Sequence, residues 1–259
     1  MKKPQPMSAA IAGALPDALP AFEPGKVIMR RCRCGEIVKP HTVRVEREGF
    51  PDTMRIMRDT CEACMKAAAE RSRLSRIEAQ LSQIPPLFRW VDLSKSLVPP
   101  RGVSAVVSAV AVKAVRDWSG RLLLIRGPTG SGKTVLAAGR YRIEVERGIE
   151  RAAFVCCDDL SPDAKDPGRA LASALAADLT VLDDLGADLS NAPAGGGLAA
   201  WRGEKVRRVI RDRRNANKRT IVTFSLEDAA IGEAYGGDIE RRLTEEVPGS
   251  VVLRLRGRT

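Results

Sequence analysis

An eight-residue stretch of the sequence has the composition of a phosphate-binding loop. Residues 127–134 read Gly-Pro-Thr-Gly-Ser-Gly-Lys-Thr and match the pattern G-x-x-x-x-G-K-[ST] in full. Glycines let the backbone curl so that successive N–H groups point at a phosphate, and the dipole of a following helix adds to the attraction. The sequence therefore predicts that ATP binds here. The residues expected to contact it are Gly127, Pro128, Thr129, Gly130, Ser131, Gly132, Lys133 and Thr134.

Two residues of this loop and an acidic pair downstream of it have the chemistry to bind Mg²⁺ and activate water. Lys133 can reach the β and γ phosphates, and the Thr134 hydroxyl can ligate Mg²⁺. An apolar run at 179–182 ends in Asp183 and Asp184. A carboxylate at the carboxyl end of a strand lies beside the phosphate loop in an open α/β sheet. We expect Asp183 to hold Mg²⁺, directly or through water, and Asp184 to polarise the attacking water.

Six cysteines fall into three close pairs, and two of these pairs have the spacing of metal ligands. Cys32 and Cys34 form a C-x-C pair, and Cys61 and Cys64 form a C-x-x-C pair. Thiolates at these spacings can offer four sulfurs to one tetrahedral ion, as is common in cytosolic proteins. The sequence predicts a structural Zn²⁺ site, since four thiolates leave no open position for catalysis. A hairpin with free thiols and a redox pair remain alternatives.

The segment between the two cysteine pairs is predicted to form a hairpin. Residues 42–46 alternate apolar and polar side chains, residues 54–57 are the expected partner strand, and residues 49–51 would form the turn. This is the layout of a zinc ribbon. His41, the single histidine of the chain, could in principle replace one ligand. A catalytic Ser-His-Asp or Cys-His arrangement would have to use this same residue, which argues against both.

Strands and helices alternate from residue 121 onward, which predicts a doubly wound α/β domain. Short apolar runs followed by helical patterns indicate buried parallel strands with helices on both faces. Cys156 and Cys157 are expected to pack on one of these strands as small apolar residues. The expected strands are 122–125, 152–157, 179–182, 220–224 and 251–255, and the expected helices between them are 135–147, 170–177 and 198–214.

The chain before this domain divides into shorter segments. Apolar residues recur every three or four positions within 66–83, as in a helix, and Pro85 and Pro86 stop the pattern. Residues 103–118 are predicted to form a buried helix. The expected domains are a flexible tail at 1–25, a cysteine module at 26–66, a helix and linker at 67–102, and an ATPase domain at 103–259.

Composition limits the class of protein. The chain has 259 residues, of which 44% are hydrophobic and 29% are charged, and this excludes a wholly disordered chain. Lys and Arg outnumber Asp and Glu by 43 to 32, and the net charge of +11 favours a polyanionic partner such as nucleic acid. No apolar stretch is long enough to span a membrane, and prolines interrupt the short apolar run near the start. We therefore expect a cytoplasmic protein with no membrane partner.

Much of the positive charge is concentrated in residues 202–219, which contain nine Lys and Arg and two acidic residues. Arg202, Lys205, Arg208 and Arg211 recur at steps of three and would share a helical face, which could follow a phosphate backbone. Trp201 is the one aromatic residue near this stretch that could stack on bases, so sequence-specific recognition of nucleic-acid bases is not predicted. A solvated helix face and a subunit interface remain open interpretations.

Taken together, these strings resemble a known family. The chain from about residue 84 is similar to the helicase-loader branch of the AAA+ ATPases, the DnaC type, and equally to the related IstB-type transposition helpers. Besides the phosphate loop, which a large superfamily shares, the resemblance rests on four strings. These are IPPLFR at 84–89, LDDLG at 182–186, TIVT at 220–223 and YGGDIERRL at 235–243, of which LDDLG and YGGDIERRL are more specific to this branch. The resemblance implies a P-loop AAA+ domain with a parallel five-stranded sheet flanked by helices, preceded by a small zinc-ribbon-like module.

The resemblance also implies roles for two further residues. The Arg before Leu in the last string is an arginine finger in this family, so Arg242 is expected to reach the γ-phosphate on a neighbouring subunit of a homo-oligomer formed with ATP. Arg241 is the rival for this role. The family has Thr-Ser-Asn after its fourth strand, where this chain has TFS at 223–225, so Ser225 would position water less well than Asn. Binding of ATP is therefore expected to be secure, and hydrolysis is expected to be slow unless Thr223 helps.

The resulting interpretation is an ATPase that loads a replicative helicase onto single-stranded DNA, with DNA-stimulated hydrolysis. The cysteine module and the helix after it would bind the partner. Two alternatives stay open. One is an IstB-like helper of DNA transposition that acts on duplex DNA, and the other is a nucleotide-binding adaptor with little turnover.

Overall fold

The computed structural model describes residues 30–38, 41–44, 53–56, 60–95, 108–186, 203–225, 228–244 and 250–255. The chain divides into two compact units, Met1–Arg71 and Ser72–Thr259. Helix α1 (Glu62–Leu81) contributes residues to both units. The tail expected at 1–25 lies outside the described residues.

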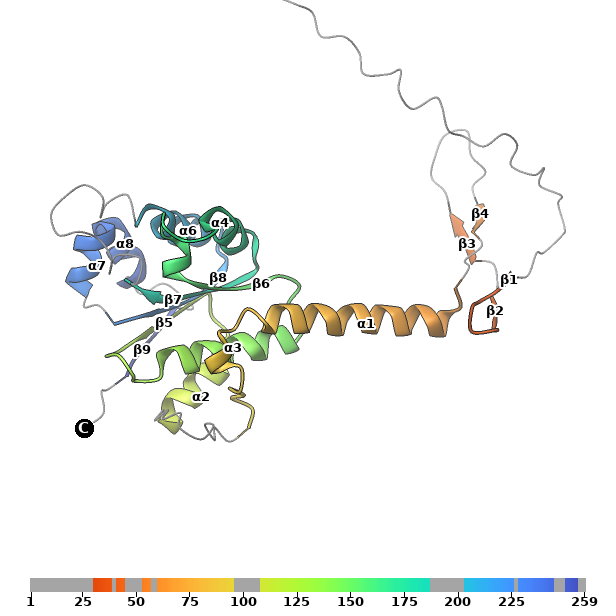
Figure 1. Ribbon diagram of the computed structural model, residues 1–259, viewed down its shortest axis with the longest axis horizontal. Helices are drawn as coiled ribbons and strands as arrows, with labels where there is room; N and C mark the ends of the chain where they lie inside the picture. Colours follow the sequence, from red (N-terminus) through yellow and green to blue (C-terminus); the bar gives the residue numbers. More distant parts are fainter. Residues whose placement is uncertain are drawn as a thin grey trace, which may run out of the picture. The chain divides into compact units, whose positions relative to one another are not determined.

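The larger unit contains a sheet of five strands in which each neighbouring pair is parallel. The spatial order is β6-β7-β8-β5-β9 (Figure 1). The strands are β5 (Leu122–Arg126), β6 (Ala152–Cys156), β7 (Leu179–Leu185), β8 (Arg219–Phe224) and β9 (Ser250–Arg254). Since all strands run the same way, their carboxyl ends meet at one edge of the sheet. The predicted fold class, a parallel five-stranded sheet flanked by helices, is confirmed.

Helices cover both faces of this sheet and make a three-layered domain (Figure 1). The helices of one face are η1 (Pro86–Phe88), α2 (Ala109–Asp117) and α3 (Lys133–Glu146). Those of the other face are η2 (Cys157–Leu160), α4 (Pro167–Ala176), α6 (Glu204–Asn215), α7 (Asp228–Tyr235) and α8 (Gly237–Thr244).

The two faces of β5 contribute to two separate apolar cores. Leu123 and Ile125 pack with residues of α2 and α3, whereas Leu122 and Leu124 pack with residues of α4 and α6. Burial on both faces explains why this strand is apolar at four successive positions.

The free edge of β6 is covered by glutamine side chains. The Gln83 Oε1 atom accepts a hydrogen bond from the backbone N–H of Phe154 at 3.1 Å, and its Nε2 atom donates to the Ala152 carbonyl at 3.5 Å. Gln80 donates to the Glu150 carbonyl at 2.7 Å. These contacts attach the residues around the end of α1 to the sheet within the larger unit.

A buried arginine ties α6 to its neighbours. Arg213 is 1% exposed, and its Nη1 atom donates to the carbonyls of Ala174 and Ala177 at 2.7 Å each. Its Nε atom donates to the Thr220 hydroxyl at 3.0 Å. Burial lowers the pKa of Arg213 to about 10. Because the carbonyls at the end of α4 take up its donors, Arg213 holds α6 against α4 and β8 and is unavailable to a phosphate backbone.

The smaller unit contains two antiparallel strand pairs. β1 (Arg30–Arg31) pairs with β2 (Ile37–Val38), and β3 (His41–Arg44) pairs with β4 (Thr53–Ile56). The second pair is the hairpin predicted between the cysteine pairs. Its expected turn at 49–51 lies outside the described residues.

Several helix limits differ from the sequence-based expectation. Helix α3 begins at Lys133, inside the loop motif, and α2 begins at Ala109, after Ser108 has capped it by accepting a hydrogen bond from the Ala111 N–H. Helices α7 and α8 were not expected, because each has only eight residues and Gly236, with a φ of 93°, separates them. None of the described helices is both long and apolar enough to cross a lipid bilayer.

We expect Arg213→Ala to lower the free energy of unfolding by about 3 kcal/mol or more, since several buried carbonyls lose their donor and a cavity opens. Arg211→Ala, on the exposed side of the same helix, should change it by less than about 0.5 kcal/mol. Chemical denaturation of the full chain measures both values. Equal effects of the two substitutions would contradict the structural role of Arg213.

Candidate functional site

The predicted phosphate loop lies between the end of β5 and the start of α3, as the motif requires. Gly127 donates its backbone N–H to the Phe224 carbonyl at 3.2 Å, which places the loop beside the end of β8. Gly130 and Gly132 have φ angles of 79° and 89°, which glycine adopts without strain. A Cβ atom at Gly127 would lie 2.8 Å from the Leu255 carbonyl oxygen. The glycines therefore determine the course of the loop.

The side chains of Lys133 and Ser131 are buried within this loop. The Lys133 ammonium donates to the carbonyls of Gly127 and Pro128 at 2.8 and 3.0 Å. Burial lowers the pKa of Lys133, while the charges of Asp184 and Asp183 act in the opposite direction. The Ser131 hydroxyl is buried and has no hydrogen-bond partner among the described residues. An unpaired hydroxyl beside a cation fits a site for an anionic ligand.

Asp183, at the end of β7, is the point at which the site is assembled. Its Oδ1 atom accepts hydrogen bonds from the Thr134 hydroxyl at 3.1 Å and from the Thr223 hydroxyl at 2.7 Å. The carboxyl group is 6% exposed, and burial raises the pKa of Asp183, while the two hydroxyl donors lower it. The structure thus brings together Thr134 and Asp183, the two residues predicted to hold Mg²⁺. A hydroxyl and a carboxylate are oxygen ligands of the kind that Mg²⁺ prefers.

Asp184 lies next to this group and is exposed. Its φ of 59° is unusual for a residue other than glycine, and its backbone N–H donates to the Thr223 hydroxyl at 2.8 Å. Thr223 therefore contacts both members of the acidic pair. The sequence named Thr223 as a residue that could help hydrolysis, but its contacts with the acidic pair depend on the adjacency of β7 and β8.

A cysteine also lies at this edge of the sheet. Cys156 is opposite Asp183 in the pairing of β6 with β7, and burial, with nearby carboxylates, raises the pKa of its thiol to about 11. It is half-buried at the end of its strand, whereas Cys157 is fully buried at the start of η2. The sequence predicted only packing for this pair.

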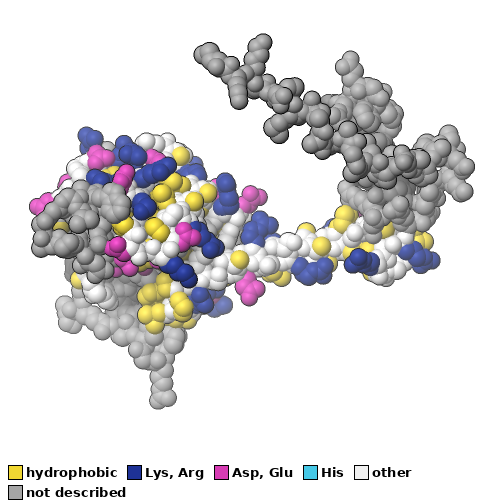
Figure 2. Space-filling view, turned by 45° about the horizontal axis from the view of Figure 1, so that its top comes forward, with side chains coloured by type: hydrophobic (Ala, Val, Ile, Leu, Met, Phe, Trp, Pro, Cys, Tyr) yellow, Lys and Arg dark blue, Asp and Glu magenta, His cyan; other side chains and the backbone are white. Residues whose placement is uncertain are grey.

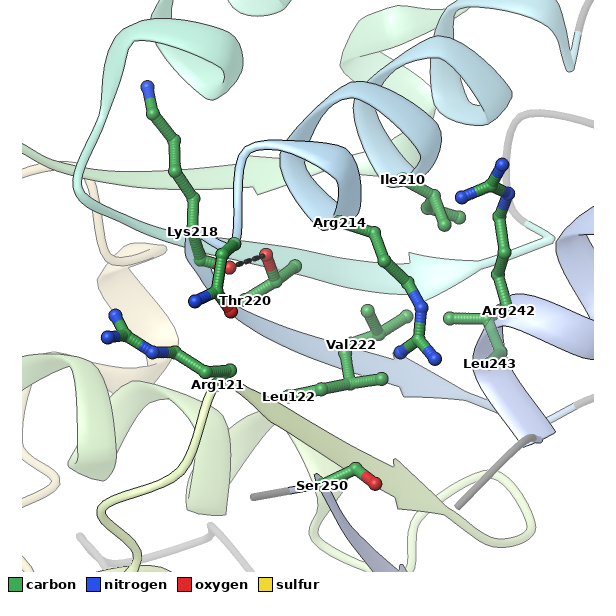
Figure 3. A pocket seen from close by; sticks show the side chains of 11 residues that line it. Arg121, Leu122, Ile210, Arg214, Lys218, Thr220, Val222, Arg242, Leu243 and Ser250 are labelled. Atoms are coloured by element: carbon green, nitrogen blue, oxygen red, sulfur yellow. Dashed lines mark hydrogen bonds between the residues drawn. The ribbon is translucent and has the colours of Figure 1, made fainter. Parts of the chain in front are cut away.

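The two other predicted catalytic residues are not brought to the acidic pair. Ser225 is exposed, one residue past β8, and no hydrogen bond joins it to Asp183 or Asp184 in the described part of the chain. Arg242, on α8, donates from Nη1 to the Asn215 side chain at 3.0 Å. It lines a cavity with Leu122, the first residue of β5, at the end of the strands away from the phosphate loop (Figure 3).

The basic stretch at 202–219 is less uniform than its sequence suggests. Arg208 and Arg211 are exposed, but both form ion pairs with Asp212, at 3.5 and 3.2 Å. The Lys218 ammonium donates to the carbonyl of Leu175, at the end of α4. Arg202 lies outside the described residues. Acidic side chains are interspersed among the basic ones on the visible face of the larger unit (Figure 2).

The four predicted zinc ligands form one cluster in the smaller unit. The sulfur atoms of Cys32, Cys34, Cys61 and Cys64 all lie within 4.8 Å of one another, and those of Cys34 and Cys61 are 3.5 Å apart. The first pair lies in a turn that two backbone hydrogen bonds close. The Cys32 N–H donates to the Glu36 carbonyl, and the Gly35 N–H donates to the Cys32 carbonyl, both at 2.8 Å. The second pair begins α1, where the Cys64 N–H donates to the Cys61 sulfur at 3.4 Å.

This donor set fits Zn²⁺. Zinc–sulfur bonds of about 2.3 Å in a tetrahedron place the sulfurs about 3.8 Å apart, close to the separations in the cluster. Backbone N–H groups of Cys34 and Cys61 lower the pKa of Cys32 to about 6, whereas hydrogen bonds with Glu36 and Cys34 raise the pKa values of Cys61 and Cys64, so the fit to zinc is carried by the geometry of the sulfurs. His41 lies in β3, close in sequence to the cluster, and only its backbone is described.

Comparisons with known proteins find similar folds. No family model and no curated protein matches the chain. Among solved structures, it is similar to AMPPCP-bound DnaA from Aquifex aeolicus, at 15% identity and a TM-score of 0.45, over 66% of this chain and 51% of that one. It is also similar to a putative primosome component from Streptococcus pyogenes serotype M3, at 15% identity and a TM-score of 0.45, over 69% of this chain and 96% of that one.

A third similar structure is that of DnaI, at 18% identity and a TM-score of 0.41, over 56% of this chain and 81% of that one. The chain spans about half the length of the DnaA structure. With these identities and TM-scores, the likenesses assign neither a family nor a function. The properties of the site are therefore taken from its own residues.

The cysteine cluster predicts one Zn²⁺ per chain, measured by elemental mass spectrometry on protein purified without chelators. The double substitution Cys61→Ser, Cys64→Ser should abolish the metal, because two thiolates bind zinc far more weakly than four. Cys156→Ser, outside the cluster, should retain it. A metal-free chain with four thiols that react freely in the native state would contradict the prediction.

Proposed function

We propose that the chain is an ATPase that binds ATP and Mg²⁺ at residues 127–134 and Asp183. The observation that carries this proposal is the meeting of the Thr134 hydroxyl with the Asp183 carboxylate at 3.1 Å, beside a buried lysine ammonium. Bound Mg²⁺ would neutralise charge on the β and γ phosphates. Lys133 would exchange the loop carbonyls for phosphate oxygens, since its ammonium already lies inside the loop.

Asp184 is the proposed general base. Its exposed carboxylate is next to Asp183, and the Thr223 hydroxyl fixes its backbone, so it is held where a water molecule could reach the γ-phosphate. Ser225 would assist from the end of β8, and its short side chain favours slow hydrolysis. An adaptor with little turnover is the alternative that this feature supports.

Arg242 is proposed to act on ATP bound to another copy of the chain. It lies at the amino ends of the strands, whereas the phosphate loop lies at their carboxyl ends. An arginine in this position can complete a site only on a neighbouring subunit, which requires a head-to-tail homo-oligomer. The guanidinium would then stabilise the charge that develops on the transferred phosphoryl group.

The proposed process is DNA replication, with the ATPase loading a replicative helicase onto single-stranded DNA in the cytoplasm. The strings LDDLG and YGGDIERRL, which resemble the DnaC-type loaders, and the net charge of +11 support this interpretation. We propose that the module at 26–66, with zinc bound, and the helix in 67–102 bind the helicase, while 103–259 forms the ATPase domain. The same strings resemble IstB-type helpers, so DNA transposition is the second candidate.

The ATPase proposal predicts that hydrolysis by the full chain needs Mg²⁺ and is lowered at least about 100-fold by Lys133→Ala, through loss of the charge on the phosphates. Asp184→Asn should retain ATP binding and lose hydrolysis to a similar extent.

A mixture of the Arg242→Ala chain with the Asp184→Asn chain should recover part of the ATPase activity, since each variant supplies across an interface the residue that the other lacks. No recovery on mixing would contradict action between subunits, and ATP binding without hydrolysis by the unsubstituted chain would favour the adaptor.

The client protein is tested by affinity capture with tagged Asp184→Asn and ATP in cells of the native host, read by mass spectrometry. Because this variant should bind ATP without hydrolysing it, assemblies should persist. We expect a hexameric replicative helicase, and we expect its loss when Lys133→Ala is used as the matched control. Capture of a transposase in place of a helicase would favour the transposition helper.

A further inference from the structure

The cavity that Arg242 lines has a volume of about 90 Å³ and lies in the larger unit, at the amino ends of β5, β8 and β9 (Figure 3). Its floor is aliphatic and is formed by Leu122, Ile210, Val222 and Leu243. The phosphate loop lies at the opposite ends of these strands, so this cavity is separate from the phosphate loop of the same chain.

The rim of the cavity carries positive charge. Arg121, Arg214, Lys218 and Arg242 line it, and none of the described lining residues is acidic. Figure 3 shows the Arg214 guanidinium extending from α6 toward Val222, while the side chains of Arg121 and Arg242 lie at other sides of the cavity. The Lys218 ammonium is already bound by helix carbonyls, so three guanidinium groups remain for a ligand.

These guanidinium groups have unused donors. Neither Arg121 nor Arg214 has a side-chain hydrogen bond or ion pair within the part of the chain that the structure describes. Arg242 uses Nη1 on Asn215, but its Nε atom is buried and has no partner among the described residues. A buried N–H group without an acceptor is uncommon and indicates a position where a ligand atom would bind.

We propose that this cavity binds an acidic peptide segment of a partner protein, with one aliphatic side chain on the floor and flanking carboxylates on Arg121, Arg214 and Arg242. Arginine and carboxylate form paired, charge-assisted hydrogen bonds of matching geometry. The aliphatic floor adds the contact that distinguishes such a segment from a plain polyanion.

The size of the cavity favours a peptide over a nucleotide. A cavity of about 150 Å³ holds one benzene ring, so the smaller space here admits a leucine or valine side chain and excludes a nucleobase. A DNA backbone would pair with the arginines but would leave the aliphatic floor uncovered. Arg242 is also the residue proposed to act on a neighbouring subunit. The tests therefore use Arg121 and Arg214, which have no part in the proposed ATP site and lie at the other edge of the sheet.

The test uses a fluorescent peptide in which one leucine is flanked on each side by two glutamates, titrated with the full chain by anisotropy. We expect saturable binding, at least about tenfold weaker with Arg214→Glu or Arg121→Glu, since each reverses a charge on the rim. Arg208→Glu, on the same helix as Arg214 and outside the cavity, is the matched control and should change affinity by less than about twofold. ATP affinity, unchanged in all three variants, reports that each is folded.

Two further peptides separate the parts of the proposal. Replacing the leucine by alanine should weaken binding at least about threefold, and replacing the glutamates by glutamines should abolish it. Carbon-13 methyl spectra should show the Val222 and Leu243 signals shifting with the leucine peptide. Shifts confined to other methyl groups would place the peptide elsewhere and overturn the proposal.

Other occupants appear as distinct outcomes. If a short oligothymidine displaces the fluorescent peptide as effectively as unlabelled peptide does, the cavity and its rim bind nucleic acid instead. Glu245 and Glu246 lie between Leu243 and Ser250 in the sequence. If Glu245→Gln with Glu246→Gln tightens peptide binding more than about tenfold, the chain's own acidic residues occupy the cavity. Either result, or no binding at about 1 mM peptide, would overturn the proposal.

Discussion

One oxygen atom of Asp183 joins the elements that make the candidate site. It accepts hydrogen bonds from Thr134 on α3 and from Thr223 on β8, so the loop, two strands and a helix meet at a single buried acceptor. The Asp184 N–H extends the same network through Thr223. Burying a carboxylate is unfavourable, as the raised pKa of Asp183 shows, and the two hydroxyl donors and the charge of Lys133 offset part of this cost.

Buried arginines are a second constraint on the fold. Trp118 has the guanidinium groups of Arg140 and Arg219 over its ring, 5.4 and 4.8 Å from its centre. Both arginines are ion-paired with Glu144, which is itself buried. Together with Arg213, these side chains fill space in a protein that has only 4% aromatic residues. The net charge of +11 therefore overstates the charge that a nucleic acid would meet at the surface.

The sequence predicted what depends on local pattern. The phosphate loop, the acidic pair, the strands and the cysteine hairpin were found from short strings whose residue types have a direct physical meaning. The contacts of Thr223 with both acidic residues could not be predicted, because they depend on which strands are neighbours. The burial of Arg213 had a signal that was missed: with Val206 and Ile210 it continues an apolar helical spacing of three and four. The position of Arg242, far from its own loop, required the folded chain.

The glutamine contacts at the edge of β6 protect the protein against self-association through that strand. An uncovered edge strand offers unpaired N–H and C=O groups to any extended chain that approaches. The Gln83 amide presents an N–H donor and a carbonyl acceptor to the strand, as a peptide group would, and it pairs with Phe154 and Ala152 without adding a strand. A fragment that begins after Gln83 would keep the phosphate loop but present a bare edge. Self-association, rather than loss of the phosphate loop, would then limit how far the chain can be shortened.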